Sequence, residues 1–133
     1  MAVTHPTDVR NAICDLVVDL IDSGSGNGTI KFQNGGQNDS VVATLTFSAT
    51  AFDDAGSAGG NAAGVAAAAA ITDDTNCKAG TVTKFTVFSG PGDSVFTGSV
   101  TATGGGGDII LSSTSIGQGD TISISSLTYE APN

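Results

Sequence analysis

Over most of this chain, apolar and polar residues alternate in short segments that are separated by glycine-rich turns. The segments TIKFQ (29–33) and VVATLTFSA (41–49) show this most clearly, and in the first of them Ile30 and Phe32 fall on one face. Alternation with a period of two is typical of β-strands that bury one face. The intervening NGGQNDS (34–40) is rich in residues that favour tight turns. The pattern predicts two paired strands and restricts the chain to a β-rich fold.

Four later segments carry the same alternation, at 80–90, 93–101, 107–113 and 120–130. With the first pair and an alanine-rich strand near 65–71, they make about seven strands, the number typical of small sandwich domains. Short strands at close spacing favour a β-sandwich or a barrel-like fold over alternating β-α units. The length of 133 residues is that of one domain. We therefore predict a mainly β, antiparallel domain over residues 7–133, preceded by an N-terminal arm at residues 1–6.

One segment, from residue 7 to about residue 22, has helical rather than strand periodicity. Its apolar stripe consists of Val9, Ile13, Leu16, Val17 and Leu20, and the SGSGNG stretch that follows ends the helix. We expect these five side chains to form the face with which an amphipathic helix covers the sheet. A polar substitution at Leu16 should then unfold the protein or collapse its assembly.

The alanine-rich stretch GVAAAAAIT (64–72) gives conflicting signals. Alanine favours helices, whereas the glycines that precede the stretch favour a loop followed by a strand. We predict a loop over about residues 53–64 and a strand after it. Such small side chains leave room for a close neighbour, either the N-terminal helix or another subunit, and the helix is the favoured alternative.

Charge excludes one large class of functions. Four basic residues stand against thirteen acidic ones, so the net charge is −9. This surface repels nucleic acid phosphates, and we expect no nucleic acid partner. The start of the chain lacks the basic and apolar regions of a signal peptide, and no apolar run approaches the length of a membrane span. We expect synthesis in a cytoplasm and no membrane partner.

Residues with catalytic or metal-binding potential are few. The single histidine, His5, precedes the helix, where it lacks the setting of a catalytic triad. The pairs Asp53-Asp54 and Asp73-Asp74 are weak calcium candidates, because no EF-hand pattern surrounds them. We therefore predict a non-enzymatic protein without catalytic residues, cofactor or metal.

The two cysteines, Cys14 and Cys77, have no metal-type spacing. Cys14 lies among apolar helix residues, where a small buried side chain is more frequent than a reactive thiol. The sequence leaves open whether the two form a disulfide.

Both ends of the chain carry a resemblance to a known group of proteins. The stretches HPTDVRNAICDLVVDLIDSGSGNGTIKFQ (5–33) and IILSSTSIGQGDTISISSLTYEAPN (109–133) resemble a family of small, acidic, Gly/Thr-rich proteins encoded among the virion structural genes of tailed bacteriophages. The resemblance implies a virion structural protein, in particular a capsid decoration (cement) protein on the outer surface of the major capsid lattice. It implies the major capsid protein as partner and a homo-oligomer, with a trimer favoured. It assigns no functional residue.

Two alternatives remain open from the sequence. One is a structural protein of the tail or neck. The other is a calcium- or carbohydrate-binding adhesion module, with the four loop aspartates as candidate ligands.

Overall fold

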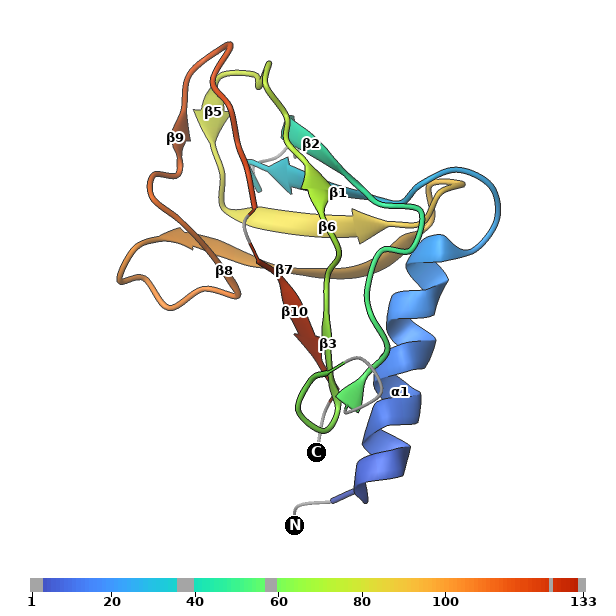
Figure 1. The fold of residues 1–133 in the computed structure, drawn as a ribbon. Coiled ribbons are helices and arrows are strands. Elements are labelled where there is room, and N and C mark those ends of the chain that lie inside the picture. Colours follow the sequence, from blue (N-terminus) through green and yellow to red (C-terminus); the bar gives the residue numbers. More distant parts are fainter. Residues whose placement is uncertain (1–3, 36–39, 57–59, 125, 132–133) are drawn as a thin grey trace.

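The computed structural model describes residues 4–35, 40–56, 60–124 and 126–131. It is mainly β with one N-terminal helix, which confirms the predicted fold class (Figure 1). In chain order the described elements are α1 (Thr7–Asp19), the 3-10 turn η1 (Leu20–Asp22), β1 (Thr29–Gln33), β2 (Val41–Phe47), β3 (Val65–Ala67), β4 (Ile71–Thr72), β5 (Gly80–Thr81), β6 (Lys84–Phe88), β7 (Ser94–Ala102), β8 (Ile109–Leu111), β9 (Ser115–Ile116) and β10 (Thr128–Glu130). Residues 1–3 of the predicted arm lie outside the described residues.

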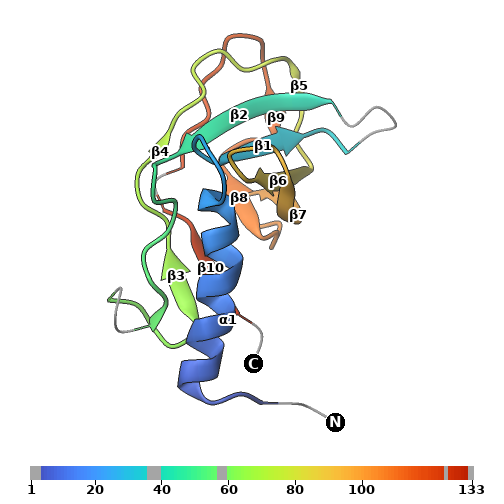
Figure 2. The same cartoon turned by 90° about the vertical axis from the view of Figure 1, so that its right-hand side faces the viewer.

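Six strands form one sheet in the order β4-β2-β1-β6-β7-β8, and this sheet curls into a half-barrel (Figures 1 and 2). Two short ribbons, β10-β3 and β5-β9, complete the β structure of the described residues. The predicted pairing of the first two strands is confirmed, with Ile30 opposite Leu45 and Phe32 opposite Ala43 in antiparallel register.

One pairing differs from the predicted antiparallel arrangement. Strands β7 and β8 are parallel, with Val100 beside Ile109 and Ala102 beside Leu111. The connection contains four consecutive glycines, of which Gly104 and Gly106 have positive φ angles of 92° and 76°. Glycine adopts these angles without steric cost, so the chain turns back within a few residues and starts β8 alongside β7.

The segment 120–130 is less regular than its alternation predicts. Among the described residues of this segment, only β10 at its end is a strand, and Ile122 forms a single antiparallel bridge to Asp74. The alanine-rich segment likewise contains two short strands, β3 and β4, instead of one. Alternation indicates which side chains face inward, but a strand also requires a partner strand within hydrogen-bonding distance.

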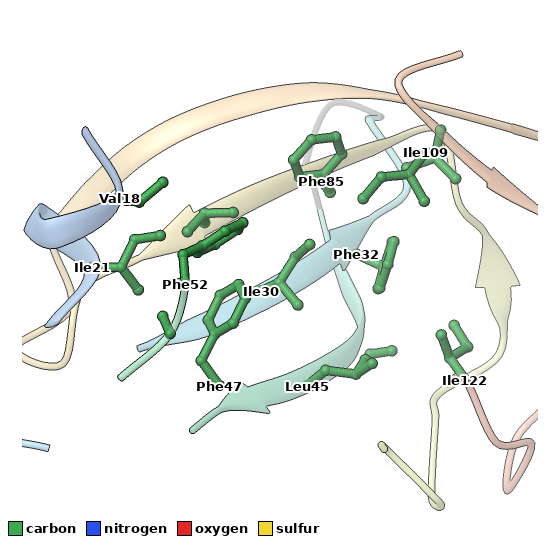
Figure 3. Close-up of a cluster of buried hydrophobic side chains, with 14 of the residues drawn as sticks. Val18, Ile21, Ile30, Phe32, Leu45, Phe47, Phe52, Phe85, Ile109 and Ile122 are labelled. Carbon is green, nitrogen blue, oxygen red and sulfur yellow. The ribbon is translucent and has the colours of Figure 1, made fainter. Parts of the chain in front are cut away.

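The core fills the concave side of the curled sheet (Figure 3). Ile30 and Phe32 of β1 and Leu45 and Phe47 of β2 are almost completely buried, as their alternation predicts. The ring of Phe47 packs against Phe52 at a centroid distance of 5.7 Å. Burial of such side chains contributes about 1.5–3 kcal/mol each to folding.

The face of α1 that packs against this core is not the predicted one. The buried residues are Cys14 and Val18 of α1 and Ile21 of η1, whereas Leu16 is 66% exposed. Val9 and Leu20 are also exposed and Val17 is half-buried. Of the five predicted residues, Ile13 is half-buried and packs against the core. The helix carries apolar residues on two sides, and the side with the smaller residues packs inward because β3 approaches it closely through the fully buried Ala66. The alanine-rich segment thus meets the helix through β3, as one of the two alternatives expects.

Candidate interaction surface

Polar side chains at the edges of the buried face of α1 fix the helix to the neighbouring loop. Asn11 Oδ1 accepts a hydrogen bond from the backbone N–H of Gly64 at 2.7 Å. Asp15 Oδ1 accepts one from Ala55 N–H at 2.7 Å. Asp22 accepts one from Ala51 N–H at 3.0 Å. Hydrogen bonds to ionised acceptors are among the stronger ones in proteins, so α1 has a defined orientation over the 51–64 loop.

A weaker contact fixes the first turns of α1 to β10. Arg10 Nη2 lies 3.5 Å from Glu130 Oε1, and the Arg10 side chain is mostly buried. Cys14 Sγ donates to the carbonyl oxygen of Tyr129 in the same strand at 3.5 Å. The helix is therefore held along its length by both β10 and the loop.

The outward side of α1 is apolar. Leu16, Leu20 and Val9 are 66%, 48% and 39% exposed, and Ala12 between them is exposed as well. We call Val9, Ala12, Leu16 and Leu20 the outer stripe. In Figure 2, α1 lies toward the viewer and no other described element passes in front of the helix. Of the four large hydrophobic residues exposed among the described residues, three belong to the outer stripe. Single exposed apolar residues are common, whereas three on one anchored helix make the outer stripe a candidate binding surface.

An acidic row runs along one side of the outer stripe. It consists of Asp8, Asp15, Asp19 and Asp22, which follow one another at helical spacing. Partial burial and the nearby carboxylates of Asp15, Asp22 and Asp54 raise the pKa of Asp19. The row is thus a local concentration of negative charge beside an apolar surface.

The calcium candidates are not brought together into a site. Asp53, Asp54 and Asp73 are exposed. Asp74 serves the fold, because its Oδ2 accepts the backbone N–H of Thr44 at 2.8 Å and its Oδ1 accepts that of Asn76 at 2.9 Å. Within the described ranges, no three His, Cys, Asp or Glu side chains gather in a way that could hold a metal ion.

The two cysteines are free and buried. Burial is the main cause that raises the pKa of both thiols, with smaller contributions from Asp15 at Cys14 and from Asp74 at Cys77. Since the thiolate is the reactive form, this setting disfavours nucleophilic chemistry at either position.

A second open region lies between β8 and the irregular segment that precedes β10. Three adjoining cavities, of about 420, 330 and 470 Å³, follow one another along it. Neighbouring cavities share lining residues. The first two are both lined by Ile110, Leu111 and Ser123, and the last two are both lined by Asp108, Ile109 and Leu127. We call this region the β8 groove. Sequence reasoning missed it, because it depends on where the 120–127 segment passes relative to β8.

No protein-family model, no curated protein and no solved structure matches this chain. Among the described helices, none has the length and apolar character that a membrane crossing requires.

Proposed function

We propose that this chain is a non-enzymatic virion structural protein that binds the outer surface of the major capsid lattice and stabilises it as a decoration, or cement, protein. The observation that carries the proposal is the outer stripe of α1. It offers a partner an apolar surface on a helix that hydrogen bonds and an ion pair already hold in place. A binding surface that is ordered before contact loses little conformational entropy on association. The resemblance of both chain ends to small acidic virion proteins supports the choice of partner.

The acidic row specifies the chemistry of the partner surface. A complementary surface has an apolar patch with lysine or arginine residues along one side. A second copy of this chain would bring the same row and the same net charge of −9 to the contact. The outer stripe therefore suits the lattice better than self-association.

We further propose a homotrimer whose subunits contact the lattice together. Closed symmetric oligomers present several identical surfaces, and simultaneous binding through them raises the apparent affinity without new contacts. The subunit contact would then lie away from the outer stripe.

Copy number in purified virions tests the role. Quantitative mass spectrometry against the major capsid protein should give a ratio near one or a simple fraction of it. A few copies per particle would place the protein in the tail or neck. Absence from the particle would overturn the virion assignment.

Binding to capsids that lack this protein tests the surface. The double variant Leu16→Gln/Leu20→Gln should cosediment with such capsids about tenfold more weakly. Full burial of a leucine side chain contributes about 1.5–3 kcal/mol, and about 1.4 kcal/mol corresponds to a tenfold change in affinity. Its thermal unfolding should be unchanged. The variant Ala79→Gln places a glutamine at an exposed position outside both the outer stripe and the β8 groove, and should bind like the native protein. Full binding by the double variant would exclude the outer stripe as the contact.

A further inference from the structure

The outer edge of β8 is an unpaired strand edge. β8 is the last strand of the six-stranded sheet and pairs with β7 alone. Among the described residues, the backbone of 109–111 forms hydrogen bonds only with β7. A strand in this position presents free N–H and C=O groups to any extended chain that reaches it.

The opposite wall of the β8 groove has the same property. This wall begins after the bridge of Ile122 to Asp74 and ends at Leu127, whose carbonyl accepts a hydrogen bond from Ala68 N–H. Between these two points, no hydrogen bond within the described chain involves the described residues Ser123, Ile124 and Ser126. The groove therefore has unpaired backbone on both sides, and three adjoining cavities separate the walls.

The side chains along the groove alternate in a way that suits an added strand. Ile109 is buried, Ile110 is 53% exposed and Leu111 is half-buried. Further along, the rings of Phe96 and Tyr129 pack at 5.0 Å and line the last cavity. Apolar residues at every second position of an incoming strand would contact this lining.

The charges along the groove indicate which polar residues an added strand should carry. Asp108 and Glu130 line the last cavity and Asp120 lines the first. No lysine, arginine or histidine is among the described residues that line the three cavities. Glu130 is partly neutralised by Arg10, but Asp108 accepts its hydrogen bonds from Ser99, a neutral residue. Lysine or arginine at alternate positions of the incoming strand would complement these carboxylates.

We infer that the β8 groove binds an extended, basic segment of a partner protein, which adds a strand to the edge of β8 with alternating apolar and Lys/Arg residues. This site is separate from the outer stripe, and the inference does not depend on the proposed function. A second copy of this chain is a poor occupant, because its own β8 would bring a second Asp108 to the contact.

Binding of the acetylated octapeptide of alternating valine and lysine tests the inference. Titration into the labelled protein, followed by NMR, should shift the amide signals of residues 109–111 and of the facing segment. Hydrogen exchange of the 109–111 amides should slow on binding. The matched octapeptide of alternating valine and glutamate should bind about tenfold more weakly or not at all, because its charges are reversed.

Two variants distinguish the groove from the rest of the surface. Ser123→Arg places a bulky cation at a residue that lines two of the cavities and should weaken binding of the lysine peptide about tenfold. Ser25→Arg makes the same charge change in an exposed bend that lines none of the three cavities of the β8 groove, and should leave binding unchanged. The outer-stripe variant Leu16→Gln/Leu20→Gln should also bind the peptide normally, so this test and the capsid test fail independently.

Three results would overturn the inference: no binding of the lysine peptide at millimolar concentration, equal binding of both peptides, or full binding by Ser123→Arg. Protection of the 109–111 amides in the free protein as its concentration rises would instead assign the edge to a second copy.

Discussion

At the scale of single residues, the thiols of Cys14 and Cys77 are buried in a setting that disfavours their reaction. Both thiols have raised pKa values because they are removed from water, and nearby aspartates disfavour the thiolate further. In the native protein, we expect neither cysteine to react with a disulfide reagent such as Ellman's reagent over hours, since thiolate and access are both lacking. In denaturant both should react at once. Rapid modification of one cysteine in the folded state would contradict its burial.

Asp19 is the carboxylate whose ionisation the fold opposes. Its pKa is raised by partial burial and by neighbouring carboxylates, so the folded state holds the proton more tightly than the unfolded chain does. Ionisation of Asp19 therefore lowers the free energy of unfolding. This loss is absent at low pH, where both states are protonated, and grows as the pH rises through the pKa of the unfolded state and then that of the folded state. It is complete at neutral pH. Asp19→Asn should therefore stabilise the protein at pH 7.

The expected gain is about 0.2–0.5 kcal/mol, the size of a like-charge pair four residues apart on a helix, because solvent screens this exposed group. Denaturant unfolding at pH 7 and at pH 3 measures it, and the gain should shrink at the lower pH. Asp8→Asn makes the same charge change in the first turn of α1, where a negative charge interacts favourably with the helix dipole. This variant should not stabilise the protein. Equal stabilisation by both variants would indicate only a general effect of net charge.

At the scale of elements, the two apolar sides of α1 have different roles. Val18→Ala removes methyl groups from a buried side chain and should lower the free energy of unfolding by about 2 kcal/mol, through lost burial and the cavity left behind. Leu16→Ala removes more atoms, but from a largely exposed side chain, and should change stability by less than about 0.5 kcal/mol. Thermal unfolding of the two variants compares them directly. The reverse order would restore the packing face expected from the sequence.

The sequence predicts those parts of the fold that depend on local patterns. Period-two alternation identified β1 and β2 with their inward residues, and the helical period with the following glycines identified the extent of α1 and η1. The prediction of the inward side of α1 was wrong. The fully buried residues are Cys14, Val18 and Ile21, which repeat at helical spacing on another side of the helix. Which side is buried is decided by Ala66 and by backbone N–H groups of the 51–64 loop, both distant in sequence. The β8 groove also depends on contacts between residues distant in sequence, because the described residues of the 120–127 segment pass beside β8 without pairing with it.

At the scale of the whole molecule, the two candidate surfaces are built on different parts of one scaffold. The outer stripe lies on α1, whereas the β8 groove lies at the free edge of the half-barrel, and β3 and β10 stand between the helix and that edge (Figure 1). Among the described residues, no hydrogen bond, ion pair or ring contact joins the outer stripe to the lining of the β8 groove. Substitutions in the two surfaces should therefore have additive effects on binding and stability. One partner engaging both surfaces would be held by two independent contacts.

The net charge of −9 acts on association through either surface. A partner surface that is locally basic is attracted before contact, so its association rate constant should fall about tenfold when NaCl is raised from roughly 50 to 500 mM, as the Debye length shortens. Surface plasmon resonance with immobilised capsids measures both rate constants. Asp8→Asn/Asp19→Asn should lessen this salt dependence, whereas Leu16→Gln/Leu20→Gln should keep it and raise the dissociation rate instead, because desolvated apolar contacts govern how long a complex lasts. Association that is independent of salt would exclude the acidic row from the encounter and leave the apolar stripe as the sole determinant of binding at α1.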